Sequence, residues 1–231
     1  MHPFVHLHVH SQYSLLDGQA SIQRLIDKAM GDGMKALALT DHGAMYGIKE
    51  FINYAGKKNA PVNAEIKKIR NEIGELVKNG AGEEQAEPLR QKLAEAEGRL
   101  FKPIVGCECY LARRNRHLQS EKIDGSGWHL VVLAKNLTGY KNLIKMVSKS
   151  WTEGFYYRPR IDKELLEQYH EGLIVSSGRF PARSTADRYR RPKRPCNGTR
   201  TCLATITIWS YNATRPTVQT PTRLPTPSRK G

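Results

Sequence analysis

The feature that most constrains this chain is a short alternating segment near its start, where residues 6–10 read His-Leu-His-Val-His. In an extended strand, a period of two places the three imidazoles on one face and the aliphatic side chains on the other. Three nitrogen ligands on one strand, with Asp17 a few residues later, predict a divalent-metal site. The alternative is a solvent-facing edge strand that is rich in histidine. A second Asp-His pair, Asp41-His42, follows another apolar strand and favours the metal site.

Strand and helix signals alternate through the first sixty residues. A strand is expected over residues 3–10, and Ser21 is expected to cap a helix with one apolar stripe. The apolar run at 35–40 is typical of a buried parallel strand, and it delivers the Asp-His pair just past its carboxyl end. A second helix is expected from about residue 46 to residue 58. This order is typical of an α/β protein with a parallel sheet or barrel.

Residues 62–100 interrupt that order. Apolar residues recur there at spacings of three and four in two halves, which a glycine-rich turn separates: Val62, Ile66, Ile69, Ile73 and Leu76, then Leu89, Leu93, Ala96 and Leu100. The pattern predicts an antiparallel helical hairpin that is packed along one narrow seam. Its functional interpretation is a docking arm for another protein. The alternative, which the charge-rich faces favour, is a tolerated surface insertion.

The α/β pattern then resumes. A strand over 103–111 places Glu108 and Tyr110 on one face and Cys107 and Cys109 on the apolar face, where we expect the thiols to be small buried hydrophobes. Further elements are expected at the following ranges: strands at 128–134 and 172–177, and helices at 137–151 and 161–170.

Charge and composition divide the chain at residue 178. Residues 179–231 contain ten Arg, two Lys and one Asp, so they carry +11 of the formal net charge of +15. They also contain ten Thr and seven of the twelve Pro, and they have no sustained periodicity, which predicts disorder. The chain has no run of eighteen apolar residues and no secretion signal, and its four cysteines form no paired motif. We therefore expect a reducing, cytoplasmic compartment and no membrane segment.

The polar residues that strands and strand-end loops would present form one candidate metal-binding set. Its members are His6, His8, Asp17, Asp41, His42, Glu108 and His129. Imidazoles and carboxylates without thiolates suit Zn²⁺, Mn²⁺ or Fe²⁺. Several such ligands can hold two or three ions, with Glu108 as a bridge. Clustered ions activate water and neutralise a phosphoryl group, so phosphoester hydrolysis is the favoured reaction class.

Five segments carry a resemblance to a known family. They are Phe4–Gly18, Leu37–Gly47, Lys102–Glu108, His129–Tyr140 and Gly154–Ile161. In this order they resemble the motifs of the PHP (polymerase and histidinol phosphatase) domain, and more narrowly of the PHP domain that begins bacterial DNA polymerase III alpha subunits. The resemblance extends over residues 3–178, apart from the hairpin.

The resemblance implies a fold, an activity and a set of ligands. The fold would be a distorted (β/α)7 barrel of TIM-like layout with metals at one mouth, and the activity a metal-dependent phosphoesterase or 3′–5′ exonuclease. Up to three divalent ions are implied, Zn²⁺ first, with Mn²⁺ or Fe²⁺ as alternatives. The implied metal ligands are His6, His8, Asp17, His42, Glu108 and His129. Glu108 and Asp41 are the implied catalytic residues, with Asp41 orienting His42 through a hydrogen bond, and His10 facing the site without binding.

The implied partners are DNA, through the parent polymerase, and other replicase subunits. Residues 1–178 would then form an incomplete PHP domain without a polymerase active site. We expect residues 179–231 to be an out-of-frame extension, and a genuine basic arm that binds DNA is the alternative. Two other functions stay open: a stand-alone PHP phosphoesterase similar to histidinol phosphatase, and a non-catalytic scaffold.

Overall fold

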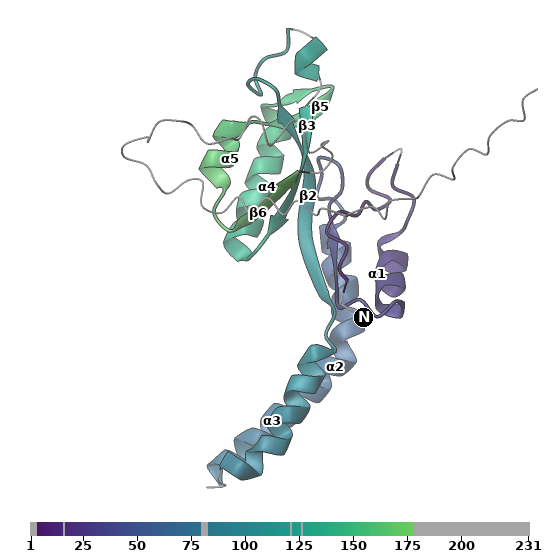
Figure 1. Ribbon diagram of the computed structural model, residues 1–231, viewed down its shortest axis with the longest axis vertical. Helices are drawn as coiled ribbons and strands as arrows, with labels where there is room; N and C mark the ends of the chain where they lie inside the picture. Colours follow the sequence, from purple (N-terminus) through teal and green to yellow (C-terminus); the bar gives the residue numbers. More distant parts are fainter. Residues whose placement is uncertain (1–3, 16, 80–82, 121, 126, 178–231) are drawn as a thin grey trace, which may run out of the picture.

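One open mixed sheet organises this chain (Figure 1), and β2 is its central and longest strand. The computed structural model describes residues 4–15, 17–79, 83–120, 122–125 and 127–177. The strands are β1 (Ala36–Leu39), β2 (Lys102–Ala112), β3 (Gly127–Ala134), β4 (Phe155–Tyr156), β5 (Arg158–Ile161) and β6 (Leu173–Ser177). Their order is β4-β5-β2-β3-β6, and β1 pairs with β2 outside this path. The α/β class is confirmed, but no closed barrel is seen across the described ranges.

Strand directions differ from those of an all-parallel barrel. β1 and β5 run parallel to β2, whereas β3 runs antiparallel to both β2 and β6. β1 pairs with the first part of β2, and β3 pairs with its second part from Gly106 onward. The beginning of β3 therefore lies beside the second half of β2, where the candidate site forms.

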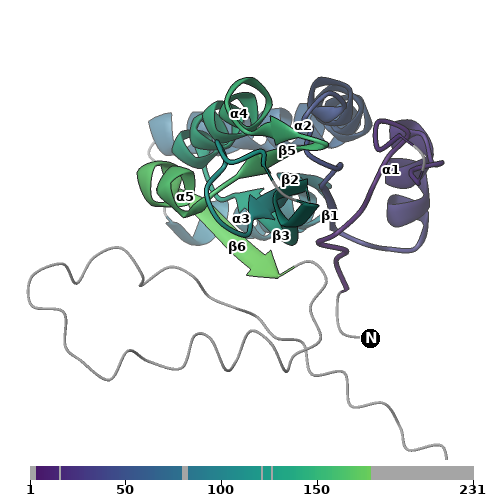
Figure 2. The same cartoon turned by 90° about the horizontal axis from the view of Figure 1, so that it is seen from above.

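Helices pack on the sheet in two groups, which are separated in the view from above (Figure 2). Their bounds are α1 (Ile22–Gly31), α2 (Ile48–Lys78), α3 (Glu83–Gly98), α4 (Leu137–Thr152) and α5 (Lys163–Tyr169), with a short 3₁₀ helix at Lys122–Gly125. α1 and α2 share a core with β1, and α4 and α5 share another with β2, β3 and β5. Cys107 and Cys109 lie buried in the second core, as the alternation of the strand predicted. Ser21 accepts a hydrogen bond from the Arg24 amide and caps α1, which is also confirmed.

Helices α2 and α3 form an arm that extends away from the sheet in Figure 1. The two helices share a seam in which Ile66, Ile69 and Ala96 are buried. The structure differs from the prediction in one respect, because α2 is a single 31-residue helix that continues through Pro61. A proline inside a helix removes a hydrogen bond and costs about 3 kcal/mol. Side chains of α2 are buried on both sides of that position, in the core with α1 and β1 before it and in the seam with α3 after it, and their burial offsets this cost.

Residues 4–10 do not form the strand that the alternation predicted. Their backbone runs beside β1, where the Ala38 and Thr40 amides donate to the carbonyls of His6 and Val9, both at 2.9 Å. The backbone turns between these two contacts, so the period of two is lost. The three imidazoles therefore do not share one face.

Two other predictions concern the rest of the chain. The basic tail predicted at 179–231 lies outside the described residues. Within them, no helix combines the length and the apolar character that crossing a membrane requires.

Candidate metal centre

Glu108 is the centre of a cluster of imidazoles at the middle of β2. Its side chain is almost completely buried, with 1% of the residue exposed. β3 brings His129 to it, because Tyr110 of β2 pairs with His129 in the antiparallel ladder. His129, a predicted ligand, lies near the start of β3. In a parallel barrel, by contrast, the residues of the site gather at the carboxyl ends of the strands. The antiparallel direction of β3 resolves that conflict.

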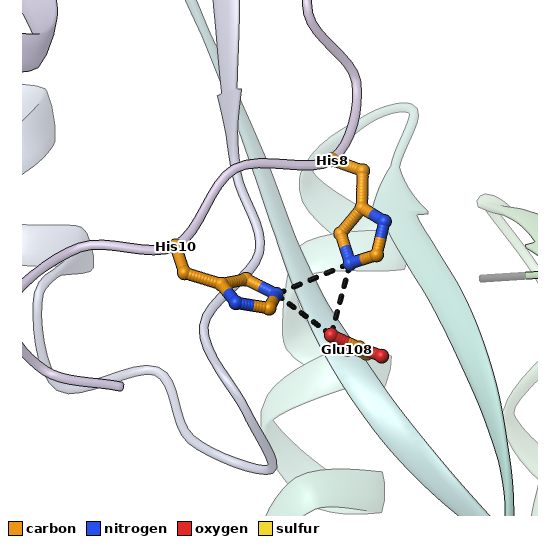
Figure 3. Close-up of side chains that lie close together, drawn as sticks. All are labelled: His8, His10 and Glu108. Carbon is orange, nitrogen blue, oxygen red and sulfur yellow. Dashed lines mark hydrogen bonds and ion pairs between the residues drawn. The ribbon is translucent and has the colours of Figure 1, made fainter. Parts of the chain in front are cut away.

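The carboxylate of Glu108 contacts four imidazoles. Its Oε2 lies 2.9 Å from His8 Nε2 and 2.7 Å from His10 Nε2, and these two nitrogens are 3.1 Å apart (Figure 3). The same oxygen lies 3.1 Å from His42 Nδ1, and the other oxygen contacts His129 Nδ1. One carboxylate thus joins side chains from the 4–10 segment, the end of β1 and the start of β3.

Asp17 is a second carboxylate beside the same imidazoles. Its Oδ2 lies 2.6 Å from His42 Nε2 and 3.3 Å from His10 Nδ1, and half of its side chain is exposed. Three overlapping groups result, and within each group the ligand atoms lie within 4.8 Å of one another: His8, His10 and Glu108; His10, Asp17 and His42; His42, Glu108 and His129.

Asp41 belongs to none of these three groups, and its carboxylate is hydrogen-bonded to two serines. Its Oδ1 accepts hydrogen bonds from the Ser11 amide at 2.6 Å and the Ser14 hydroxyl at 2.7 Å, and its Oδ2 accepts from the Ser11 hydroxyl at 2.8 Å. Ser14 Oγ in turn accepts a hydrogen bond from the His42 amide at 3.1 Å. Asp41 is therefore joined to His42 through Ser14, and it fixes the loop that carries His10 and Asp17.

His6 lies outside the three groups. Its ring packs edge-on against Phe4 at a centroid distance of 4.7 Å, and the residue is exposed. The structure brings His10 into the cluster in its place. The regular strand that the sequence predicted placed all three imidazoles on one face, and the family resemblance favoured position 6 over position 10 as a ligand.

The imidazoles keep Glu108 ionised. Burial alone would raise the pKa of this carboxyl group, but hydrogen bonds with His10, His8 and His129 outweigh it and hold the pKa far below its usual range. The hydrogen bond to Glu108 raises the pKa of His10, against the burial that lowers it. Without metal, the buried Glu108 carboxylate thus favours the protonated form of His10 and is itself held by hydrogen bonds with the imidazoles.

The donor set fits a divalent cation. His42 Nδ1 is a buried nitrogen for which no hydrogen-bond partner is found among the described residues, although Glu108 Oε2 lies 3.1 Å from it. A buried nitrogen without a hydrogen-bond partner lowers the stability of the folded state, unless it binds a ligand such as a metal ion. Imidazole and carboxylate ligands without thiolates suit Zn²⁺, Mn²⁺ and Fe²⁺.

Sequence reasoning missed three residues that shape this cluster, namely Ser11, Ser14 and Tyr110. Tyr110 carried a signal, because its alternation with Glu108 places both on one face of β2. Its ring lies edge-on to His129, with centroids 4.9 Å apart, and stacks on His42 at 6.0 Å. The serines carried no comparable signal, since their partner Asp41 is distant in sequence.

The sequence pattern that defines the PHP domain matches residues 6–199 of this chain. This match continues past residue 178. The chain is 44% identical over 175 residues to the DNA polymerase III subunit alpha of Treponema pallidum, and 40% identical over 195 residues to that of Borreliella burgdorferi. It is 36% identical over 179 residues to that of Thermus aquaticus. The alignments include 75%, 82% and 76% of this chain, but only 11% to 13% of the length of these relatives.

Proposed function

This chain belongs to the PHP domain family, and we propose that its cluster is a metal-dependent phosphoesterase centre of the DNA polymerase III alpha type. The observation that carries the proposal is the buried Glu108 carboxylate, which contacts four imidazoles from three separate segments. We propose Zn²⁺ as the metal, with Mn²⁺ or Fe²⁺ as alternatives. The proposed ligands are His8, His10, Asp17, His42, Glu108 and His129.

The protein's own residues would do three things in the reaction. Glu108 has one oxygen toward His129 and the other toward three further imidazoles, so it would help to hold the metal with both groups of ligands. Asp17 is half exposed, so its carboxylate is accessible from solvent and would accept a proton in the reaction. When bound, the divalent ions would supply an activated water and neutralise charge on the phosphoryl group. Asp41 is a positioning residue, because its bonds end on Ser11 and Ser14.

We propose nucleic-acid phosphodiesters as the substrate, with 3′–5′ removal of nucleotides as the reaction. Support comes from the relatives, which carry the name DNA polymerase III subunit alpha. DNA and other replicase subunits are the corresponding partners. We infer that the described residues form part of the (β/α)7 barrel that the family implies, because β6 ends their sheet with an open edge.

The test combines metal analysis with hydrolysis. The full chain, loaded with Zn²⁺ or Mn²⁺ and freed of excess metal, is expected to retain metal in stoichiometric amounts and to shorten a 5′-labelled single-stranded oligonucleotide from its 3′ end. His10→Asn should lose most bound metal, whereas the matched variant His6→Asn should retain it, because His6 lies outside the cluster. Hydrolysis of a phosphomonoester alone would favour the histidinol-phosphatase-like alternative. Metal uptake without any hydrolysis would favour the scaffold.

A further inference from the structure

We propose that Arg158 binds the phosphoryl group of the substrate beside the metal centre, an inference that rests on the proposed phosphoesterase function. Arg158 begins β5, and its Nη1 donates a hydrogen bond to Tyr110 Oη at 2.7 Å. Its Cζ lies 4.9 Å from the centre of the Tyr110 ring. Tyr110 therefore holds the guanidinium by both its hydroxyl and its ring.

The ring of Tyr110 contacts both Arg158 and two proposed metal ligands. One contact of this ring is with His129, at a centroid distance of 4.9 Å, and another is with His42, at 6.0 Å. Arg158 thus lies one aromatic ring away from the imidazoles. We infer that the long, exposed side chain of Arg158 reaches a phosphoryl group held at the metal ligands.

The backbone around Gly43 fixes the distance between Arg158 and the cluster. Gly43 follows His42 and has a φ of +58°, and a Cβ there would lie 2.6 Å from Pro159 Cγ. The Trp151 indole donates to the Gly43 carbonyl at 2.8 Å. Arg158 immediately precedes Pro159, so the strand that carries it is packed directly against the residue next to His42. The close approach requires glycine at position 43.

Arg158 differs from the neighbouring arginines in the partners of its guanidinium group. Arg114 pairs with Asp124, and Arg116 pairs with Asp162, Glu153 and Glu164. The guanidinium of Arg160 donates to four backbone carbonyls. Arg158 is exposed, and no ion pair between it and a carboxylate is found in the part of the chain that the structure describes. Its only hydrogen-bond partner there is the neutral Tyr110 phenol, which leaves several N–H donors for an anion.

A phosphoryl group is the anion that this arrangement fits. The planar guanidinium presents paired N–H donors that match two phosphoryl oxygens, while cations on the cluster side would hold the others. An internal diester and a terminal phosphate share this chemistry. The experiment therefore uses one probe of each kind: dimethyl phosphate for the diester and inorganic phosphate for the terminal group.

Calorimetric titration of the metal-loaded full chain tests the proposal through binding rather than turnover. Arg158→Gln is expected to weaken phosphoryl binding about tenfold, which corresponds to about 1.4 kcal/mol, with no change in bound metal. Arg158→Lys keeps the positive charge but loses the paired N–H donors of the guanidinium. Its affinity for the phosphoryl probes should therefore lie between those of the wild type and Arg158→Gln. The matched control is Arg113→Gln, because Arg113 is exposed and lies 5.6 Å over the ring of Trp128, which packs against the core on the other face of the sheet.

The outcomes separate this inference from the proposed function. A wild-type affinity of Arg158→Gln for both probes, at equal metal content, overturns the role of Arg158 and leaves the metal centre intact. A wild-type chain that takes up no metal overturns the proposed function before any anion is added. Weakening that is confined to dimethyl phosphate supports an internal diester at Arg158, and weakening that is confined to inorganic phosphate supports a terminal group there.

Discussion

The backbone of His42 pairs with that of Glu108 in an isolated parallel bridge. Two hydrogen bonds surround the bridge, from the Glu108 amide to the Asp41 carbonyl at 3.0 Å and from the Gly43 amide to the Glu108 carbonyl at 2.8 Å. The pairing of β1 with β2 is thus continued past the end of β1 to two proposed ligands. Their separation is set by main-chain geometry, so changes to either side chain should affect ligand chemistry more than architecture.

The first prediction concerns the carboxylate of Glu108. Glu108→Gln keeps the shape of the side chain but removes the charge that four imidazoles contact. Metal affinity is expected to fall by at least about 100-fold, and hydrolysis with it. Mass spectrometry of the reloaded protein gives the metal content. Glu65→Gln on the arm, where Glu65 pairs with Arg99, is the matched control and should retain full metal.

Removal of metal should change the melting temperature of the wild type but not that of Glu108→Gln. A ligand at 100 times its dissociation constant stabilises the folded state by about 2.7 kcal/mol, so a chelator should lower the melting temperature of the wild type. The melting temperature of Glu108→Gln should not respond to the chelator. Equal responses of the two proteins would show that Glu108 does not hold the metal.

The second prediction concerns pH. In the metal-free protein, the hydrogen bond with Glu108 raises the pKa of His10, while burial opposes it, so the imidazole keeps its proton to a higher pH than usual. The cation must displace that proton from a cluster that also includes His8, Asp17 and His42. Metal uptake should therefore release protons, and the apparent affinity should rise with pH above the ordinary range of histidine.

Potentiometric titration during metal addition measures this release directly. In weakly buffered solution at neutral pH, the wild type should acidify the medium as metal binds. His10→Asn should release fewer protons for each ion that it still binds. Uptake without proton release would contradict a protonated His10 in the metal-free state.

The third prediction concerns Asp41, which is 2% exposed and accepts three hydrogen bonds. Asp41→Ala leaves the Ser11 and Ser14 donors without a partner, and it is expected to lower the free energy of unfolding by about 2–4 kcal/mol. Denaturant unfolding in the presence of a chelator measures this loss without any contribution from metal. The exposed pair of Lys28 and Asp32 gives the control Asp32→Asn, with an expected change of less than about 0.5 kcal/mol.

Two substitutions of Asp41 show whether this residue positions the loop or binds the metal itself. Asp41→Asn keeps one acceptor oxygen for the serine loop, so it should retain more metal than Asp41→Ala. If Asp41 were itself a ligand, the two variants would lose metal alike.

Local patterns in the sequence predicted much of this fold. The alternation in β2 placed Glu108 and the buried cysteines on opposite faces, and the Ser21 cap marked the start of α1. These signals depend on neighbours within a few residues, so they can be read from the sequence alone. The conclusion that histidines and carboxylates from separate segments come together also depended on such signals.

The structural features that the sequence patterns did not predict depend on contacts between residues that are far apart in the sequence. Asp41 is hydrogen-bonded to the serine loop, residues 4–10 make two irregular contacts with β1, and His10, not His6, lies in the cluster. The direction of β3 follows from the pairing of Tyr110 with His129, which no local pattern encodes. Likewise, α2 continues through Pro61 because a seam with the distant α3 stabilises it.

The fourth prediction concerns Arg160, a guanidinium with no exposed surface. It donates to the carbonyls of Gly154, Leu118, Asp124 and Arg116 at 2.6–3.1 Å, and so joins the turn before β4 to the segment between β2 and β3. Arg160→Met removes all four donors and leaves buried carbonyls unpaired. The free energy of unfolding is expected to fall by roughly 3–5 kcal/mol.

Two measurements distinguish this bracing role from ordinary packing. Arg160→Lys should be destabilised nearly as much as Arg160→Met, because an ammonium group cannot reach four carbonyls in one plane. Hydrogen exchange in residues 116–120 should rise in both variants, since the carbonyls of Arg116 and Leu118 lose their contacts. Arg113→Met, at an exposed arginine near the end of β2, is the control and should change neither quantity. Unfolding of Arg160→Lys at the wild-type denaturant concentration would show that charge alone stabilises this position.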